Sequence, residues 1–257
     1  MTILVALILG LVQGLTEFLP VSSSGHLMLL NQIFKIEGDF LFISIVLHLA
    51  TLFAIVIVFY KEIWQLIKHP FSKQAINLYI ATIPTVTIVL LFKAFIEKFF
   101  NNASLLPFCF MFTAFLLVIT QFLSNKKQVD FNKQIKTSSA FIMGISQGFA
   151  VIPGISRSGS TICTGLILGE EREQTAKFSF LMSIPIIFAS LLYEIIFTDS
   201  VITIKTVGVL PLLIAFLSAF LVGILSIKFM LRVVKNSKYY YFSIYLIALS
   251  ILSFFII

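Results

Sequence analysis

Apolar residues along this chain fall into long runs separated by short polar loops. A helix needs roughly 20 apolar residues to cross the hydrocarbon core of a bilayer. We predict a membrane-spanning helix in each of six runs: Phe40–Tyr60, Ala75–Phe92, Ser104–Leu123, Phe178–Phe197, Val207–Met230 and Tyr239–Ile257. Because a backbone without water must satisfy its hydrogen bonds internally, the predicted fold class is an all-α polytopic membrane protein.

Four further apolar stretches are too short to span a membrane: Thr2–Gly14, Ser24–Phe34, Ser139–Ala150 and Ser158–Gly169. They form two pairs, and a break rich in Pro, Gly and Ser interrupts each pair. Short helices around such a break are typical of re-entrant hairpins, which are tolerated at membrane depth where they line a polar cavity. We therefore predict two re-entrant helical hairpins.

The two breaks resemble each other. GLVQGLTEFLPVSSSGH begins at Gly10 and GISQGFAVIPGISRSGS at Gly144, and six aligned positions are identical. This pattern predicts a single membrane domain over residues 1–257. It is built from one repeat over about 1–123 and a second over about 135–257, each a hairpin plus three transmembrane helices. Because three is odd, the second repeat is inverted relative to the first.

Positive charge is unevenly shared between the loops. Twelve Lys and Arg residues lie in loops that would share one side of the membrane: 61–74, 124–138, 170–177 and 231–238. Four lie in the opposite loops: 31–39, 93–103 and 198–206. Cytoplasmic loops carry the excess of Lys and Arg, so we expect both termini outside. The first hairpin then enters from outside and the second from the cytoplasm, with their tips meeting near the midplane.

Composition agrees with this topology. The chain is 59% hydrophobic and 11% charged, whereas a soluble domain carries about 25% charged residues. The net charge of +7 is explained by the cytoplasmic loops, so we expect no nucleic-acid partner.

The hairpin tips predict an anion site. Helices that start near Ser24 and Ser158 would direct their N-termini at the membrane interior, where unpaired amides and the positive dipole end attract anions. Two such termini suit a di-anionic group such as a diphosphate. Four serines at the tips are good N-cap residues, and capping or direct ligand contact both remain open for them: Ser22, Ser24, Ser156 and Ser158.

Positions that differ between the two breaks are the candidates for chemistry: Glu17, Ser23, His26 and Arg157. Arg157 can bind phosphate oxygens bidentately and stabilise charge during phosphoryl transfer. His26 lies about one helical turn after Ser23 and can act as general acid, base or nucleophile. The structural alternative is a buried Glu17–Arg157 ion pair with satisfied polar neighbours. His48, inside a predicted span, is expected to be a hydrogen-bonded packing residue.

QGLTEFLPVSSSGH and PGISRSGST together resemble the two signature motifs of the undecaprenyl-diphosphate phosphatase family, also called the bacitracin-resistance proteins. The resemblance runs from Gly10 to the final spans. It implies hydrolysis of the lipid undecaprenyl diphosphate to undecaprenyl phosphate and inorganic phosphate at the outer face of the bacterial plasma (inner) membrane. That reaction recycles the lipid carrier of peptidoglycan synthesis and confers bacitracin resistance. The resemblance also implies Mg²⁺ or Ca²⁺ as cofactor and is compatible with a homodimer.

By this resemblance the four differing residues named above take the family's catalytic positions. Gln13 takes the first place of a Glu/Gln-xxx-Glu pattern, where some members have Glu. Because Gln13 is neutral, a metal would depend on Glu17, substrate oxygens and water, which suits Mg²⁺. The diphosphate-binding positions we expect are Gln13, Ser22, Ser24, Gly25, Ser156, Ser158 and Thr161.

Two other functions compete with this one. A transporter that flips a polyprenyl phosphate also uses inverted repeats and a midplane anion site, but pure transport needs no proton-transfer group such as the Ser23–His26 pair. A phosphatidic-acid-type phosphatase shares a serine-glycine-histidine element but needs a second catalytic histidine. Only His48 and His69 remain for that role. The sequence leaves open whether Ser23, His26 or water attacks.

Overall fold

The computed structural model describes the chain apart from residues 37–39, 101–102, 125–133, 198–206 and 236–238. Every regular element in the described part is helical, which confirms the predicted all-α class. In chain order the elements are α1 Ile3–Thr16, α2 Ser23–Phe34, α3 Phe40–Val58, α4 Tyr60–Lys68, α5 Lys73–Leu91, α6 Lys93–Phe100, η1 Ala103–Leu105, α7 Leu106–Ser124, α8 Thr137–Phe149, α9 Arg157–Ile167, α10 Arg172–Leu181, α11 Ser183–Phe197, α13 Val209–Lys235 and α14 Tyr240–Ile256.

Five helical segments of the described chain are long and apolar enough to cross a membrane: Phe40–Val58, Lys73–Leu91, Ala103–Ser124, Arg172–Leu192 and Val209–Lys235. The chain is therefore a multi-pass membrane protein. The sixth predicted span is the shorter helix α14, of 17 residues. The fourth predicted span starts earlier than expected, at Arg172, and is divided between α10 and α11.

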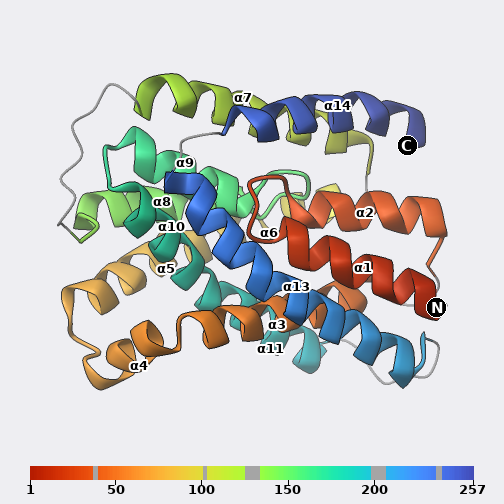
Figure 1. Cartoon of the computed structure of the whole chain (residues 1–257), viewed down its shortest axis with the longest axis horizontal. Helices are drawn as coiled ribbons and strands as arrows, with labels where there is room; N and C mark the ends of the chain where they lie inside the picture. Colours follow the sequence, from red (N-terminus) through yellow and green to blue (C-terminus); the bar gives the residue numbers. More distant parts are fainter. Residues whose placement is uncertain (37–39, 101–102, 125–133, 198–206, 236–238) are drawn as a thin grey trace.

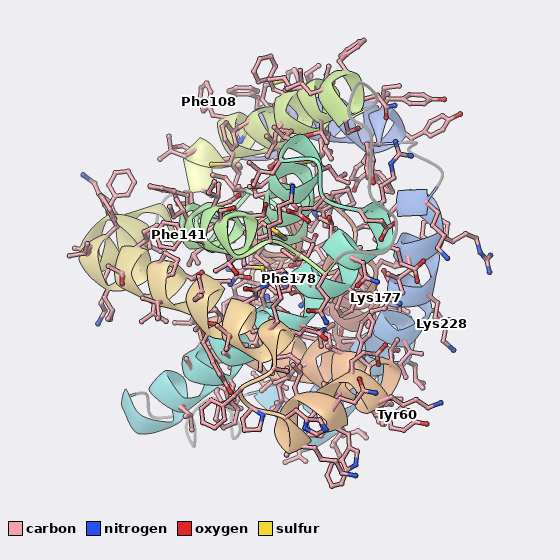
Figure 2. All side chains as sticks on the ribbon, turned by 90° about the vertical axis from the view of Figure 1, so that its left-hand side faces the viewer. Tyr60, Phe108, Phe141, Lys177, Phe178 and Lys228 are labelled. Carbon is pink, nitrogen blue, oxygen red and sulfur yellow. The ribbon has the colours of Figure 1, made fainter. Side chains whose placement is uncertain are left out.

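The outer surface of the bundle is apolar, as lipid contact requires. Phe108 is 61% exposed and Phe141 46% exposed, and both are labelled in Figure 2. Many more large apolar side chains of α13 and α14 are exposed in the same way. Exposed apolar area on this scale is unusual for a soluble monomer, so these faces suit hydrocarbon.

The four short apolar stretches are helices within two residues of their predicted starts. They form two hairpins, α1 with α2 and α8 with α9. In Figure 1 the chain termini lie at the same end of the molecule.

The first helix of each hairpin packs along a long helix of the other half of the chain. α1 runs parallel to α13, because Gly10 contacts Ala215 and Gly14 contacts Ala219. α8 likewise packs along α5. Gly144 lies so close to α5 that an added Cβ would be 2.1 Å from the Ala81 carbonyl oxygen. Small residues at these contacts let the helix backbones approach closely, as is typical of helix pairs in membranes.

The third long helices of the two halves, α7 and α14, lie side by side and antiparallel (Figure 1). Ser250 of α14 donates a hydrogen bond from Oγ to the Pro107 carbonyl at 2.8 Å. At the other end of the pair, the Tyr239 amide donates to Gln121 Oε1 at 3.3 Å. This pair covers one side of the hairpins, because α7 contacts α9 and α14 contacts α2.

The turns of the two hairpins touch each other. Ser158 Oγ donates a hydrogen bond to the Leu19 carbonyl oxygen at 2.9 Å. A Cβ on Gly25 would lie 2.9 Å from Gly154 Cα, so a side chain there would collide with the second turn. The fold thereby brings together two motifs that are distant in sequence.

Candidate active site

Glu17, directly after α1, is the centre of a buried polar cluster. Its Oε2 accepts a hydrogen bond from Ser23 Oγ at 2.6 Å and from Gln13 Nε2 at 3.0 Å. Its Oε1 accepts from Arg157 Nη2, which belongs to the second hairpin. The carboxyl side chain is only 4% exposed. The structure thus brings together three of the four predicted catalytic residues.

The serines of the two motifs place Ser23 and Arg157 at the first positions of their helices. Ser22 caps α2, with Oγ accepting from the Gly25 amide at 3.3 Å. Ser156 caps α9, with Oγ accepting from the Gly159 amide at 3.0 Å. Both serines therefore cap their helices in the structure. Because the first amides of a helix lack intrahelical acceptors, both N-termini also present donors beside Glu17.

Arg157 has donor capacity beyond its bond to Glu17. Nη2 engages the carboxylate, while Nη1 is buried and has no hydrogen-bond partner in the structure. A buried guanidinium nitrogen without an acceptor is costly. An anionic ligand would satisfy it, and the bidentate geometry of guanidinium fits phosphate oxygens.

His26 lies on α2, and both of its ring nitrogens have hydrogen-bond partners. Its Nδ1 is 2.7 Å from the Ser22 carbonyl oxygen, which only accepts, so Nδ1 carries a proton. Its Nε2 is 2.6 Å from the Tyr245 hydroxyl of α14. In the neutral ring Nε2 accepts a hydrogen bond from the Tyr245 hydroxyl, and it is the ring nitrogen that can take up a proton.

Some of the other predicted binding residues contact Glu17, and the rest contact the helices around it. Gln13 touches Glu17, and its buried Oε1 has no hydrogen-bond partner. Ser24 Oγ lies 3.4 Å from Ser22 Oγ at the tip of α2. Thr161 is turned toward α10, where its Oγ1 is 2.6 Å from Ser179 Oγ. Gly25 is required by the close approach of the second turn.

Sequence reasoning missed two residues of the site. His48 was expected to be a packing residue, yet its Nε2 lies 3.5 Å from Glu17 Oε2. The available signal was that an ionisable residue inside a span is usually functional. Tyr245 belongs to the last helix and gave no sequence signal, because tyrosines near helix ends are common in membrane proteins.

The donor set does not fit a divalent cation held by the protein itself. The described residues contain no group of three or more His, Cys, Asp or Glu side chains that could bind a metal. Glu17 already accepts from Arg157, Ser23 and Gln13. The neighbouring guanidinium would also repel a cation.

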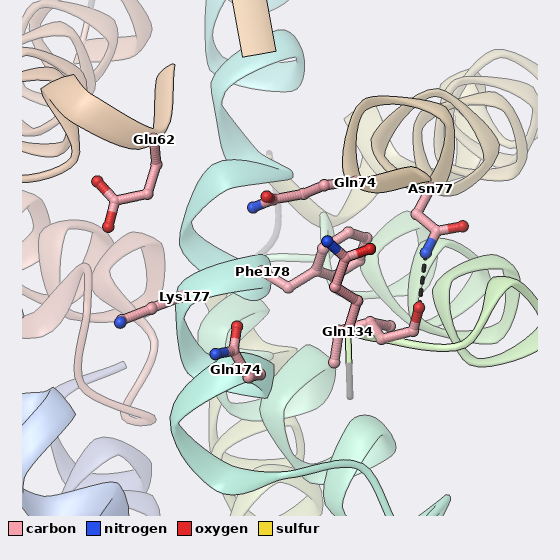
Figure 3. Close-up of a pocket in the computed structure, with 8 residues that line it drawn as sticks. Glu62, Gln74, Asn77, Gln134, Gln174, Lys177 and Phe178 are labelled. Carbon is pink, nitrogen blue, oxygen red and sulfur yellow. Dashed lines mark hydrogen bonds between the residues drawn. The ribbon is translucent and has the colours of Figure 1, made fainter. Parts of the chain in front are cut away.

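A second polar pocket lies away from this cluster (Figure 3). Its lining residues are Glu62, Gln74, Asn77, Gln134, Ile135, Gln174, Lys177 and Phe178. Asn77 Nδ2 donates to the Ile135 carbonyl oxygen at 2.7 Å, the contact drawn in Figure 3. None of the lining residues that the structure describes is a serine or histidine that could act as nucleophile or base, so the Glu17 cluster is the better candidate for chemistry.

Comparison with known proteins places the chain in a family. Residues 6–252 match the family described as bacitracin resistance protein BacA. The chain belongs to the BacA family. The match covers every residue of the Glu17 cluster and both hairpins except the first residues of α1, which confirms the resemblance drawn from the two motifs.

Relatives of this BacA-family chain carry the name undecaprenyl-diphosphatase. The protein of Carboxydothermus hydrogenoformans is 40% identical, over 93% of this chain and 92% of its own length. That of Bacteroides thetaiotaomicron is 40% identical, over 95% of both chains. That of Treponema denticola is also 40% identical, over 98% of this chain and 96% of its own.

Proposed function

We propose that this BacA-family protein hydrolyses undecaprenyl diphosphate to undecaprenyl phosphate and inorganic phosphate. The observation that carries the proposal is the buried contact of Ser23 with Glu17 beside Arg157, whose Nη1 is without a partner. The cluster lies at two helix N-termini, which suits a diphosphate. The names of the relatives describe the same reaction.

Substrate binding is assigned to Arg157 and to the N-termini of α2 and α9. Nη1 of Arg157 binds an oxygen of the terminal phosphate, and the helix amides bind the remaining oxygens. The helix N-termini are fixed before substrate arrives, because Ser22 and Ser156 cap them, and Glu17 holds Nη2 of Arg157. Preorganised donors of this kind stabilise the charge that develops during phosphoryl transfer.

Ser23 is the nucleophile that the geometry favours. Its hydroxyl already donates to Glu17 Oε2 at 2.6 Å, so the carboxylate can take the proton as the serine attacks. The Ser23 Oγ–phosphorus bond forms at the terminal phosphate, and the bond to the leaving undecaprenyl phosphate breaks. Water then releases inorganic phosphate from the phosphoserine. His26 is the other acid-base group of the site and acts through Nε2.

A divalent cation, Mg²⁺ or Ca²⁺, would be bound through the diphosphate oxygens and water rather than by Glu17. The neutral Gln13 and the Arg157 guanidinium beside the carboxylate support this assignment. Mg²⁺ usually keeps several waters and binds phosphates in this manner.

We assign two inverted repeats to the chain, with re-entrant hairpins and a site that opens to the outer face of the plasma membrane. The reciprocal packing of α1 on α13 and of α8 on α5 supports the repeat, because α5 and α13 are the second spans after their hairpins. The excess of Lys and Arg in four loops supports the orientation.

A lipid transporter is the weaker alternative. Transport needs an anion site, but it does not need a carboxylate placed to accept a serine proton. The relatives are also named for hydrolysis, so the comparisons do not favour transport.

The direct test is product analysis with the purified protein in detergent and undecaprenyl diphosphate as substrate. With Mg²⁺ or Ca²⁺ present, we expect inorganic phosphate and undecaprenyl phosphate in equal amounts. If folded protein releases neither product, the tips form an anion site without hydrolysis, and transport becomes the leading function.

A further inference from the structure

His48 of α3 faces the site through one ring nitrogen. Its Nδ1 lies 2.7 Å from the Ser44 carbonyl oxygen, one turn earlier on the same helix. A carbonyl only accepts, so Nδ1 carries a proton and is fixed there. Nε2 is therefore the atom left for the site, and it lies 3.5 Å from Glu17 Oε2. A carboxylate oxygen only accepts, so in this contact Nε2 carries a second ring proton and points it at Oε2. The His48 side chain is 24% exposed, against 4% for Glu17.

Arg157 is needed in two places during the proposed reaction. In the structure Nη2 pairs with Glu17, and the diphosphate binds the same guanidinium through Nη1. Once a diphosphate shares the charge of Arg157, the buried carboxylate is left with a weakened counter-ion, which is unfavourable. Glu17 would then be free to leave Ser23. His48 and Gln13 are the other groups that contact Oε2, the oxygen that accepts from Ser23.

We propose that His48 is a positioning residue, which holds Glu17 beside Ser23 while Arg157 binds the diphosphate. The inference rests on the proposed hydrolase function. Its imidazole reaches Glu17 from α3, whereas Gln13 reaches it from α1, the helix that precedes Glu17 itself. The carboxylate is thus fixed from α3 as well as from α1, and neither contact involves Arg157.

Two amide substitutions of His48 distinguish the role of Nε2 from that of Nδ1. In His48→Gln the side-chain amide nitrogen takes the approximate place of Nε2 and can still reach Glu17. In His48→Asn it takes the approximate place of Nδ1 and can reach only Ser44. Both variants are neutral and similar in polarity, so we expect them to change the free energy of unfolding by similar amounts. His48→Leu removes both contacts.

The proposal predicts a change in kcat without a matching change in KM. With undecaprenyl diphosphate in detergent, His48→Leu and His48→Asn should lower kcat roughly 10- to 100-fold, because a displaced catalytic group costs about that much. KM should stay within about twofold, since Arg157 and the helix amides still bind the substrate. His48→Gln should restore most of kcat. His69→Leu, at an exposed position between α4 and α5, is the control and should match wild type.

Two kinetic results would overturn the proposal. One is a wild-type kcat in His48→Leu. The other is rescue by His48→Asn but not by His48→Gln, which would assign the role to the Ser44 contact alone.

Thermal unfolding tests the contact of His48 with Glu17 without measuring turnover. It therefore tests the proposal even if the wild type releases no phosphate. His48→Leu should lower Tm by about 2–4 °C in the wild-type background. It should lower Tm much less in Glu17→Gln, where the carboxylate partner is gone. Equal losses in both backgrounds would show that His48 and Glu17 are not coupled, and the proposal would fail. Absence of phosphate release from the folded wild type would instead count against the hydrolase function.

Discussion

Arg157 and Glu17 are 140 residues apart in the sequence, yet their side chains form an ion pair that joins the tips of the two hairpins. Neither hairpin contains both groups, so the cluster exists only when the two halves of the chain are packed together. A buried ion pair contributes little stability by itself, because desolvation offsets the attraction. Because Arg157 keeps one guanidinium nitrogen without a partner and the pair lies beside the Ser23 hydroxyl, a catalytic role explains the pair better than a structural one.

Substitution of Arg157 by Lys should distinguish the effect of its positive charge from that of its bidentate guanidinium geometry. Arg157→Lys keeps the positive charge but loses the fork that reaches Glu17 and phosphate together, so we expect kcat/KM to fall roughly 10²–10³-fold. Steady-state phosphate release from undecaprenyl diphosphate measures this. Full activity in Arg157→Lys would show that bidentate binding is not needed.

Removal of the whole side chain tests the structural alternative. Arg157→Ala leaves the Glu17 charge buried and should destabilise the protein by about 3–5 kcal/mol. The double variant Arg157→Ala with Glu17→Gln should regain much of that stability in thermal unfolding but no activity. A double variant that regains activity along with stability would mean that the pair is only structural.

Substitution of Ser23 identifies the nucleophile. Ser23→Ala should lower turnover at least roughly 10³-fold, because the group that forms the covalent bond is lost. Rapid quenching with substrate labelled in the terminal phosphate should trap labelled wild-type protein and leave Ser23→Ala unlabelled. Ser72→Ala, at the cap of α5, is a control for serine loss elsewhere. Near-normal turnover in Ser23→Ala would assign the attack to His26 or water.

We expect Tyr245 to affect turnover by orienting the His26 imidazole. Tyr245→Phe keeps the ring, which lies parallel to His26 with centroids 5.7 Å apart, and removes the hydroxyl that hydrogen-bonds Nε2. We expect a loss of about 1 kcal/mol in stability and a lower kcat, since only the Ser22 carbonyl then orients the imidazole through a hydrogen bond. Tyr79→Phe, an exposed tyrosine of α5, is the control. Unchanged kcat and Tm in Tyr245→Phe would show that the Tyr245 hydroxyl does not orient His26.

Much of this fold was predictable because apolar runs and breaks control it directly. The second helices of the hairpins, α2 and α9, begin within one residue of their predicted starts, since Ser22 and Ser156 are strong cap residues. The meeting of the tips was predicted, whereas the direct contact of Glu17 with Arg157 was predicted only in the structural alternative. The direction of His26 toward Tyr245 was not predictable, because it depends on how α14 packs against α2. The place of His48 depends in the same way on the packing of α3.

The glycines of the first hairpin helices should be intolerant of any side chain. Gly144→Ala would place a methyl group 2.1 Å from the Ala81 carbonyl oxygen, so α8 and α5 must separate. We expect a loss of about 1–3 kcal/mol in stability, measured by thermal unfolding in detergent. Gly223→Ala, whose nearest contact would be 3.1 Å, should cost clearly less. Equal losses would mean that the close approach does not decide stability.

The measurement that tests the central claim most directly is phosphate release from undecaprenyl diphosphate by Glu17→Gln beside Glu62→Gln. Each variant exchanges one carboxylate for an amide, at the proposed site in one case and at the second pocket in the other. The Ser23–Glu17 assignment predicts that Glu17→Gln loses roughly 10²–10⁴-fold in turnover, while Glu62→Gln matches wild type. A folded Glu17→Gln protein with wild-type turnover would contradict it.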